Sequence, residues 1–386
     1  MAGTPLTIGV VAGEASGDLL GAQLVKALHE RLPQARFTGI GGPRMQSAGL
    51  DSLFPMEKLA VRGYSEVLRH YAEIVGIRRR LAAHYLAEPP ALFVGVDAPD
   101  FNLDLELKLR AAGIPTAHFV SPSIWAWRPG RISKIRRAVS RMLVIFPFER
   151  EIYERAGVPV TYVGHPLAEM IVPGRDRAAA REQLRIPVTA RVIALLPGSR
   201  VSELEQMAAL FVDTAAQIAS TVPDVQFLVP LVNRPTREKF EVALYARENL
   251  ELNMTLLFGH AHDAMAAADV VLAASGTATL EAALVGRPMV ITYRMPPLSW
   301  QLMKRHKRLP YVGLPNILSG EFVAPEFLQD EATAENLSQA VLNLLFDGTV
   351  RARLESRFAA MAEELKQDSA QRIAEGLLPL VWAATP

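Results

Sequence analysis

Residues 269–281 read DVVLAASGTATLE, an apolar run that passes through a turn of small residues into a helix carrying an acid. Val270–Ala274 contains no polar residue, which is typical of a parallel strand buried on both faces. The turn Ser275–Thr277 leads into a helix whose first N–H groups lack internal partners and can bind a phosphate. Glu281 lies one helical turn after Thr277, where its carboxylate could accept hydrogen bonds from two ribose hydroxyls. The stretch predicts a strand–turn–helix unit with a nucleotide site, although a turn without a ligand remains the alternative.

The composition indicates about two domains and excludes cysteine chemistry. The chain has 386 residues, of which 50% are hydrophobic and 21% charged, so it can bury large cores. Its formal net charge of +1 argues against a general nucleic-acid binder. The absence of cysteine excludes disulfides and thiol nucleophiles and fits a reducing compartment. The strand-like run Leu6–Val11 follows the N-terminus without a signal-peptide pattern, and no apolar run reaches about 18 residues, so a cytoplasmic protein is expected.

Strand-like apolar runs alternate with amphipathic helical segments, which predicts an α/β protein with parallel sheets. The expected strands are Ile8–Ala12, Phe37–Ile40, Leu92–Val96, Thr116–Val120, Met142–Ile145, Thr161–Val163, Val192–Leu196, Gln226–Pro230, Thr255–Phe258, Val270–Ala274 and Met289–Tyr293. Proline and glycine cluster near 165–175, where a hinge is expected. We therefore expect two Rossmann-like, doubly wound domains, 1–168 and 169–350, facing across a cleft, and a helical tail, 351–386.

The first turn of the chain tests the class of nicotinamide-dependent dehydrogenases. Residues 13–18 read GEASGD, and residues 39–42 read GIGG at the end of the second expected strand. Both the G-x-G-x-x-G fingerprint and the ribose-binding acid are therefore missing, which excludes a nicotinamide dinucleotide site. Glu14 and Ser16 are nevertheless expected at the cleft. The alternative is that Ser16 or Asp18 caps the following helix.

A second turn of interest, Leu195–Arg200, reads LLPGSR at the end of a strand of the expected second domain. Gly198 lets the backbone approach a phosphate, and Arg200 can hold a diphosphate through charge-assisted hydrogen bonds of about 1.5–3 kcal/mol each. The alternative is a surface salt bridge with Glu203. Because this turn and Ser275–Glu281 belong to the same expected sheet, together they favour a diphosphate and ribose site on one edge.

Eight segments of the chain match the motifs of one family in sequence and in order. They are Val11–Asp18, Gly41–Met45, Val94–Asn102, Ser121–Trp127, Leu195–Arg200, Ser275–Glu281, Tyr293–Met295 and Leu314–Asn316. These segments span nearly the whole chain and resemble the lipid-A-disaccharide synthase family. The resemblance implies a GT-B glycosyltransferase fold, with the donor nucleotide on the C-terminal domain and the acceptor on the N-terminal one. It also implies an inverting transfer that joins UDP-2,3-diacylglucosamine to 2,3-diacylglucosamine 1-phosphate, giving UDP and a β-1,6-linked lipid A precursor.

The implied transfer needs a base for the acceptor 6-hydroxyl and positive charge for the departing UDP. Asp97 is the candidate base, because it follows Leu92–Val96 at the carboxyl end of a strand, where α/β sheets place ligands. The alternative is that Asp97 only braces the turn. His118, near the end of the next strand, is the second candidate base or else a core histidine. The expected catalytic residues are Asp97, Arg200 and Glu14.

Neither a metal nor a cofactor is expected. Asp97–Asp100 reads DAPD, which differs from the D-x-D motif with which metal-using glycosyltransferases hold a cation and a diphosphate. Arg200, the Ser275–Thr277 amides and Arg294 are expected to neutralise UDP instead.

Two sets of residues complete the expected site. The donor set is Gly198, Ser199, Arg200, Gly259, Ser275, Gly276, Thr277, Glu281 and Asn316, the last included because its loop matches the family. The acceptor set, expected in the cleft of the N-terminal domain, is Ser16, Asp100, His118 and Arg294.

The implied substrates carry acyl chains, so we expect a peripheral contact with the inner membrane. The stretch 66–85 supports it with apolar residues at helical spacing beside the basic run Arg78–Arg80, although such a stripe also suits a protein core. The expected membrane contacts are Val67, Leu68, Tyr71 and Ile74. Basic clusters at 128–137 and 304–308 are either solvated faces or sites for the acceptor phosphate or bilayer.

Partners and rival functions follow from the same residues. The expected partners are UDP-diacylglucosamine, diacylglucosamine 1-phosphate and the membrane surface, without nucleic acid, and a homodimer through the tail is an open expectation. A UDP-sugar epimerase of the same fold is one alternative, and a non-catalytic lipid- or nucleotide-binding module is the other.

Overall fold

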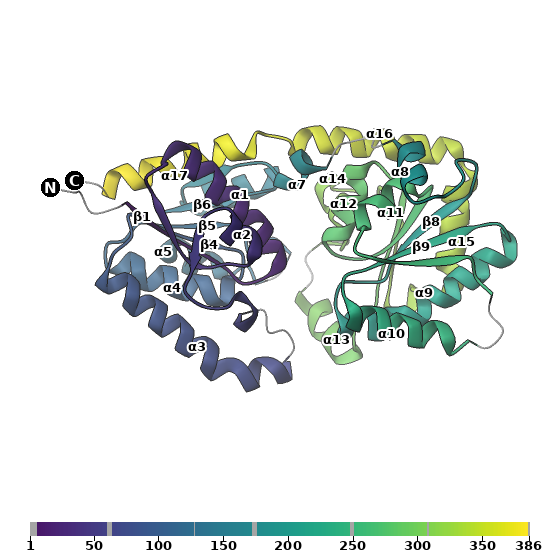
Figure 1. The fold of residues 1–386 in the computed structure, drawn as a ribbon, viewed down its shortest axis with the longest axis horizontal. Coiled ribbons are helices and arrows are strands. Elements are labelled where there is room, and N and C mark those ends of the chain that lie inside the picture. The colour runs from purple at the N-terminus through teal and green to yellow at the C-terminus, as the bar shows by residue number, and fades with distance from the viewer. Residues whose placement is uncertain are drawn as a thin grey trace. The chain divides into compact units, whose positions relative to one another are not determined.

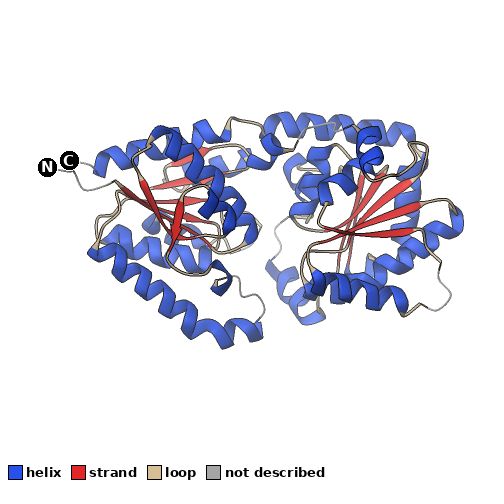
Figure 2. Ribbon diagram, in the orientation of Figure 1, coloured by secondary structure: helices blue, strands red, loops and turns tan. Residues whose placement is uncertain are grey.

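The computed structural model describes residues 6–59, 64–126, 128–171, 176–247, 251–306 and 309–384. The chain divides into two compact units (Figure 1). Unit 1 comprises Met1–Glu169 with Leu365–Pro386, and unit 2 comprises Met170–Glu364. Helices cover the parallel sheet of each unit, which confirms the expected α/β class (Figure 2). In the described part of the chain, every helix is too short or too polar to cross a bilayer.

Unit 1 contains a parallel seven-stranded sheet with the order β3-β2-β1-β4-β5-β6-β7. Its strands are β1 (Thr7–Ala12), β2 (Arg36–Ile40), β3 (Leu50–Ser52), β4 (Leu92–Val96), β5 (Thr116–Phe119), β6 (Arg141–Val144) and β7 (Val160–Tyr162). Its helices are α1 (Ala15–Arg31), α2 (Pro43–Ser47), α3 (Tyr64–Ala87), α4 (Pro99–Ala111), α5 (Arg131–Ala138), α6 (Pro147–Arg155), α7 (Pro166–Met170, ending at the unit boundary) and α17 (Ser369–Ala384). Successive strands are added on one side of β1 up to β3 and on its other side from β4 onward. This topological switch point lies between β1 and β4, so ligands are expected at the carboxyl ends of these two strands.

Unit 2 contains a parallel six-stranded sheet with the order β10-β9-β8-β11-β12-β13. Its strands are β8 (Val192–Leu196), β9 (Gln226–Leu231), β10 (Met254–Phe258), β11 (Val270–Ala274), β12 (Met289–Tyr293) and β13 (Glu326–Leu328). Its helices are α8 (Arg177–Gln183), α9 (Val201–Thr221), α10 (Arg234–Tyr245), α11 (Ala261–Ala267), α12 (Thr277–Val285), α13 (Pro297–His306), α14 (Leu314–Ser319), α15 (Ala334–Phe346) and α16 (Gly348–Leu365). The corresponding topological switch point of this sheet lies between β8 and β11.

The expected strands are all present, as β1, β2 and β4–β12. Two strands were not expected, β3 and β13, which have three residues each and lie at the edge of a sheet. Neither Leu50–Ser52 nor Glu326–Leu328 belongs to an apolar run, so the pattern that located the other strands, including the equally short edge strand β7, could not reveal them.

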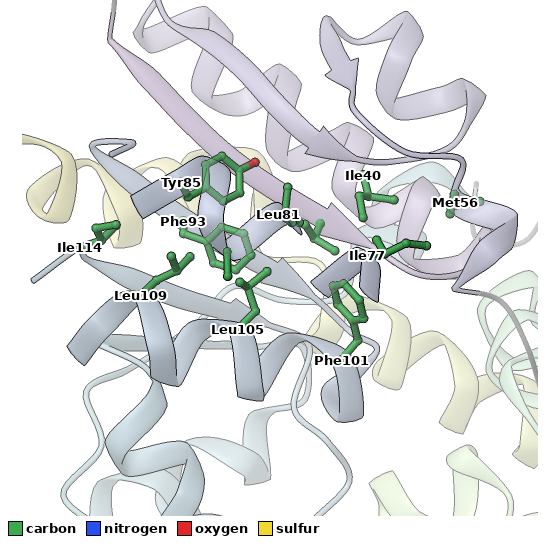
Figure 3. Close-up of a cluster of buried hydrophobic side chains, with 12 residues drawn as sticks. Ile40, Met56, Ile77, Leu81, Tyr85, Phe93, Phe101, Leu105, Leu109 and Ile114 are labelled. Carbon is green, nitrogen blue, oxygen red and sulfur yellow. The ribbon is translucent and has the colours of Figure 1, made fainter. Parts of the chain in front are cut away.

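One core of unit 1 fills the space between α3, α4 and the sheet. Ile77, Leu81 and Tyr85 of α3 are buried with Phe93 of β4, and Leu105 of α4 joins them (Figure 3). Burying each large apolar side chain contributes roughly 1.5–3 kcal/mol. The apolar residues in the C-terminal part of the amphipathic stretch 66–85 therefore belong to the core of unit 1.

The C-terminal segment is divided between the two units. Helix α16 belongs to unit 2 up to Glu364, whereas α17 packs on α1 and on strands β4, β6 and β7 of unit 1. Ile373 and Leu377 of α17 are completely buried. A Cβ atom on Gly376 would lie 2.9 Å from Leu143 Cδ2 and 3.3 Å from Thr161 Oγ1, so the helix approaches β6 and β7 closely. The expected tail 351–386 is thus part of both units rather than a separate one.

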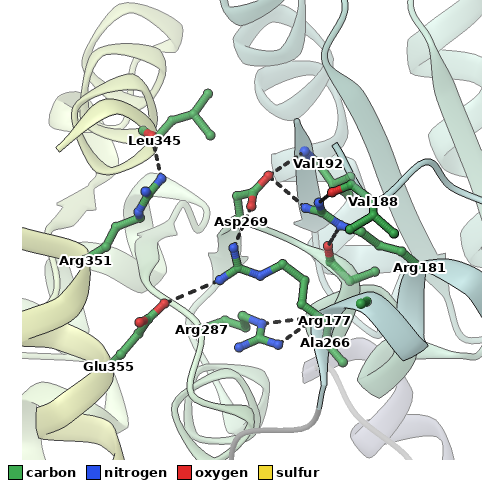
Figure 4. Close-up of polar contacts among 12 residues, drawn as sticks. Arg177, Arg181, Val188, Val192, Ala266, Asp269, Arg287, Leu345, Arg351 and Glu355 are labelled. Carbon is green, nitrogen blue, oxygen red and sulfur yellow. Dashed lines mark hydrogen bonds and ion pairs between the residues drawn. The ribbon is translucent and has the colours of Figure 1, made fainter. Parts of the chain in front are cut away.

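Asp269, the residue that precedes β11, ties the amino end of the unit 2 sheet to two helices (Figure 4). Its carboxylate accepts hydrogen bonds from Arg177 Nη1, Arg181 Nη2 and the Val192 amide, each at 2.9 Å. Arg177 also pairs with Glu355 of α16 at 3.5 Å. This network joins α8, α16, β8 and β11 at the end of the sheet opposite to the expected site.

Candidate functional site

The two glycine turns of unit 2 meet around one cavity of about 350 Å³. Strands β8 and β11 are neighbours, with Leu196 paired to Ala273, so the turns that follow them lie side by side. The cavity is lined by seven of the expected donor residues, which are Gly198, Ser199, Arg200, Ser275, Gly276, Thr277 and Glu281. The structure therefore brings a guanidinium, hydroxyls, a helix N-terminus and a carboxylate to one pocket.

Glycine is required at both turns by the backbone. Gly198 has φ +132° and Gly276 has φ +148°, a region that L side chains rarely adopt. A Cβ on Gly198 would also lie 2.7 Å from Glu203 Cβ. Helix α12 begins at Thr277, and its Thr279 amide donates to Gly276 O at 3.1 Å, so the preceding Thr277 and Ala278 amides are the ones suited to an anion.

Glu203 holds the β8–α9 turn in place. Its carboxylate accepts hydrogen bonds from the Ser199 amide at 2.9 Å, the Arg200 amide at 3.2 Å and Arg200 Nη1 at 2.6 Å. The salt bridge that was the alternative reading of Arg200 is therefore present. Because a guanidinium has five N–H donors, this pairing still leaves donors for a diphosphate in the cavity that Arg200 lines.

The sequence motifs did not predict the roles of two residues that line the cavity, Glu203, which stabilises the turn, and Tyr293. Tyr293 ends β12 and lines the cavity. Burial, with a contribution from the Glu203 carboxylate, raises the pKa of Tyr293, so the phenol stays protonated at neutral pH and can donate a hydrogen bond. The motif Tyr293–Met295 was noted, but only its arginine was assigned a role.

Glu281 lines the cavity, and one of its carboxylate oxygens is hydrogen-bonded to His262. His262 Nε2 lies 3.1 Å from Glu281 Oε2. The second carboxylate oxygen can serve the ribose hydroxyls, so the expected role of Glu281 is compatible with its surroundings. Gly259 (φ +69°) forms the neighbouring β10–α11 turn and does not line the cavity.

Two expected site residues instead brace unit 2. Asn316 is completely buried; its amide donates to Ala324 O and Glu326 Oε1 and accepts from the Val323 and Ala324 amides, all at 2.8 Å. This saturated side chain has no group left for the donor.

Arg294 belongs to unit 2 rather than to the acceptor side in unit 1. Its guanidinium donates to the carbonyls of Gln329 and Ala332, which anchors the segment after β13. Both corrections arise from tertiary contacts that a motif does not reveal.

In unit 1, Asp97 occupies a strained turn between β4 and α4. Asp97 and Ala98 have φ +50° and +44°, left-handed conformations that non-glycine residues adopt at a cost of about 1–3 kcal/mol each. Asn102 Nδ2 donates to the Asp97 carbonyl at 2.8 Å, and the Asp97 amide donates to Phe119 O at 2.9 Å. Burial raises the pKa of the Asp97 carboxyl, while His118 and the Ala98 amide oppose the rise. A raised pKa makes this carboxylate a stronger base.

His118 is a fully buried core histidine. Its Nδ1 lies 2.7 Å from Glu106 Oε1, and neither side chain has exposed surface. Burial raises the pKa of Glu106, which His118 opposes by charge and hydrogen bonding. With no exposed atom, His118 cannot reach an acceptor, which argues against its role as a base or as an acceptor contact.

The β1–α1 turn lies against the Asp97 turn. A Cβ on Gly13 would be 2.9 Å from Ala98 Cβ, so the two turns are in contact. Glu14 is the N-cap residue of α1 without a side-chain cap, and Ser16 is exposed in the first helical turn. Asp18 accepts the Arg44 and Met45 amides at 3.1 and 3.0 Å and therefore caps α2, not α1 as the alternative reading proposed.

The remaining expected contacts fall outside this turn pair. Asp100 is 78% exposed and forms an ion pair with Arg131, which makes it a surface residue. Tyr71 is exposed, whereas Ile74 is half-buried and packs against the core of unit 1, which argues against its expected role as a membrane contact. The side chains of Val67 and Leu68 lie outside the described residues.

The basic cluster 128–137 is partly neutralised by neighbouring carboxylates. In the cluster 128–137, Arg131 pairs with Asp100, and Lys134 lies 2.6 Å from Asp104. Residues 307 and 308, with most side chains of the other cluster, lie outside the described part.

Comparisons with known proteins point to one family. A family described as lipid-A-disaccharide synthetase matches residues 8–378. The lipid-A-disaccharide synthase of Methylobacillus flagellatus is 54% identical over 375 residues, covering 97% of this chain and 99% of the relative. That of Azoarcus sp. is 56% identical, with coverages of 96% and 95%.

Solved structures with low sequence identity share the fold. The UDP-GlcNAc 2-epimerase of Neisseria meningitidis bound to UDP-GlcNAc matches with a TM-score of 0.63 and 12% identity, covering 97% of this chain and 99% of its own. Anabaena HepE in complex with UDP and glucose matches with a TM-score of 0.57 and 16% identity, covering 97% and 100%. The two Rossmann-like units are thus those of the GT-B fold.

Proposed function

This chain belongs to the lipid-A-disaccharide synthetase family and is a glycosyltransferase, and we propose from that premise which residues carry the reaction. Unit 2 binds the UDP part of the donor, and unit 1 supplies the base for the acceptor. The observation that carries the proposal is the cavity of about 350 Å³ that both glycine turns of unit 2 line. The epimerase alternative is not favoured, because the epimerase likeness is one of fold at 12% identity.

In the proposed donor complex, the diphosphate lies between Arg200 and the first amides of α12. Arg200 and these amides supply positive charge, which stabilises the negative charge that develops on UDP as it leaves. Glu281 accepts hydrogen bonds from the ribose hydroxyls. HepE, which binds UDP on the same fold, supports a nucleotide on a unit of this kind.

Asp97 accepts the proton of the acceptor 6-hydroxyl as that oxygen attacks the anomeric carbon of the donor. The bond from the anomeric carbon to UDP breaks as the new glycosidic bond forms, so the anomeric centre inverts. The proton on Asp97 then passes to solvent. The turn geometry and the raised pKa of Asp97 support this role.

A peripheral contact with the inner membrane is part of the proposal, since the implied substrates carry acyl chains. Tyr71 is 59% exposed on α3, and Arg79 and Arg80 are exposed on the same helix. An exposed aromatic side chain on the same helix as exposed cations suits the interface of an anionic bilayer.

The direct test mixes the purified protein with UDP-2,3-diacylglucosamine and 2,3-diacylglucosamine 1-phosphate and identifies the products by mass spectrometry. We expect UDP and the disaccharide 1-phosphate in equal amounts. A folded protein that forms neither would contradict the proposal. UDP-N-acetylglucosamine alone is the control for epimerase activity and should be recovered unchanged.

A further inference from the structure

A buried polar cluster lies directly behind the Asp97 turn. Asn102 and Glu106 are four residues apart on α4 and therefore share one face of the helix. His118 lies on β5 opposite Gly95 of β4, two residues before Asp97. Asn102, Glu106 and His118 have no exposed surface, so the cluster is sealed between α4 and the sheet.

The backbone leaves room for this cluster at Gly95. A Cβ there would lie 2.2 Å from Glu106 Oε1, which means that the carboxylate occupies the space of the missing side chain. The same oxygen lies 2.7 Å from His118 Nδ1. Burying two ionisable groups is costly, and apolar residues of similar volume often stabilise such a site more. Packing alone therefore gives no reason for the pair.

The cluster is also incompletely hydrogen-bonded. Six buried side-chain polar atoms in the described part of the chain lack a hydrogen-bond partner, and Asn102 Oδ1, Glu106 Oε2 and His118 Nε2 are three of them. Each unsatisfied buried polar group costs about 1–3 kcal/mol. Several unsatisfied buried polar atoms beside a strained turn are typical of a functional site.

The cluster acts on Asp97 through two routes. Asn102 Nδ2 donates to the carbonyl oxygens of Asp97 at 2.8 Å and Val11 at 3.2 Å, which holds the left-handed turn. His118 acts on the Asp97 carboxylate by charge, whereas Glu106 acts on His118.

Other charged groups near the cluster are already paired. Lys134 of α5 acts on Glu106 but lies 2.6 Å from Asp104, and Arg78 of α3 lies 2.9 Å from the same carboxylate. The charged groups that act on the pair are therefore Asp97 at the end of β4 and Lys134 of α5, and Asp104 neutralises Lys134.

We propose that Glu106 and His118 are positioning residues for Asp97. Glu106 holds the His118 ring through its hydrogen bond, and His118, buried beside the end of β4, favours the ionised form of Asp97 until the acceptor proton arrives. The pair keeps its own proton throughout, and the acceptor proton passes only to Asp97 and then to water. This inference rests on the proposed role of Asp97 as the base.

The test is the pH dependence of kcat and kcat/KM for Glu106→Gln. Glutamine keeps the volume and the hydrogen bond to His118 but removes the charge. We expect kcat to fall about tenfold or more, with the donor KM and UDP affinity unchanged, and the acid limb to move up by about one pH unit. In the Asp97→Asn background, Glu106→Gln should cause no further loss of turnover, because the group it assists is gone.

The matched control is Tyr85→Phe, which removes another buried polar group of unit 1. The Tyr85 hydroxyl donates to Thr38 O at 2.8 Å, remote from the β4–α4 turn. This variant should lose stability without moving the acid limb. A structural role for Glu106 alone would give the same result as Tyr85→Phe.

A second measurement needs no variant that could misfold. The ¹⁵N chemical shifts of His118 in the full chain should show Nδ1 protonated and hydrogen-bonded, as expected for a ring held by Glu106. An unprotonated Nδ1, or an unchanged acid limb in Glu106→Gln, would overturn the inference while leaving Asp97 as the base. Full turnover by Asp97→Asn would instead overturn the proposed base, so the two failures are distinguishable.

Discussion

The carboxyl edges of the two sheets differ in what surrounds them. In unit 2, the β8 and β11 turns pass through glycines with positive φ and line an open cavity. In unit 1, the β4 turn carries two left-handed residues other than glycine and is backed by the buried Glu106–His118 pair. Backbone amides and a guanidinium suit an anion, whereas a carboxylate in a buried, charged setting suits a proton. One strand order therefore serves two kinds of chemistry.

The ionisable groups follow the same division. The carboxyl groups for which burial raises the pKa, Asp97, Glu106 and Glu149, all belong to unit 1 in the described part of the chain. The unit 2 cavity instead has Arg200 with its Glu203 partner and the neutral phenol of Tyr293. Variants in the two units should therefore separate turnover from nucleotide affinity.

The largest effect is expected from Asp97→Asn. Removing the base should lower the turnover rate about 10²- to 10⁴-fold, because asparagine cannot take the acceptor proton. The rate of UDP release measures this loss. Asp51→Asn, which alters an exposed carboxylate of unit 1 paired with Arg36, is the control and should keep the wild-type rate. Equal rates for both variants would remove Asp97 from the mechanism.

A smaller effect is expected from Arg200→Ala in unit 2. Losing its charge-assisted hydrogen bonds should weaken UDP binding by about 1.5–3 kcal/mol, or about 10- to 150-fold. Isothermal titration with UDP measures it. Arg234→Ala is matched, since Arg234 also pairs with a glutamate of its own helix, Glu238 at 2.7 Å, and should bind UDP normally. Unchanged affinity in Arg200→Ala would place the diphosphate elsewhere.

Glu149 makes the stability of unit 1 depend on pH. Burial raises the pKa of Glu149 from 4.5 to about 7, so the folded state holds a proton that the unfolded state loses first. Its contribution is present below pH 4.5 and is lost as the pH rises toward 7. His165, whose pKa burial lowers to about 4, acts in the opposite sense.

Glu149→Gln isolates this contribution. Relative to the wild type, its free energy of unfolding should rise by about 2 kcal/mol between about pH 5 and pH 7. Urea unfolding followed by tryptophan fluorescence measures the difference, because Trp125 Nε1 lies 2.9 Å from Glu149 Oε1. A constant difference between the two proteins would show that Glu149 does not titrate in this range.

The smallest effect compares exposed tyrosines of the two units. Tyr71→Ser on α3 should weaken binding to anionic liposomes by about 1 kcal/mol, or about fivefold, as an interfacial aromatic contact is lost. Tyr245→Ser on α10, where the tyrosine is 74% exposed, is the control and should pellet like the wild type. Co-sedimentation of the folded variants measures both, and equal pelleting would place the membrane contact elsewhere.

The sequence predicted the regular parts of this molecule and the groups that its turns bring together. Alternating apolar runs located every strand of the described chain except β3 and β13, and two glycine turns predicted a diphosphate and ribose site on one edge of the second sheet. Asn316 and Arg294 show where that reasoning fails, because their hydrogen-bond partners lie outside each motif, at residues 323–326 and 329–332. The contact between Glu106 and His118 was not predicted for a related reason. The two residues lie on a helix and a strand, and only the packing of these elements brings them together.

The central claim is that nucleotide binding and proton transfer belong to different units. Its most direct test is the UDP dissociation constant of Asp97→Asn, determined by calorimetry on a preparation whose turnover has been measured. We predict a dissociation constant within about twofold of the wild-type value, with turnover almost abolished. A dissociation constant that rises in proportion to the loss of turnover would contradict the claim.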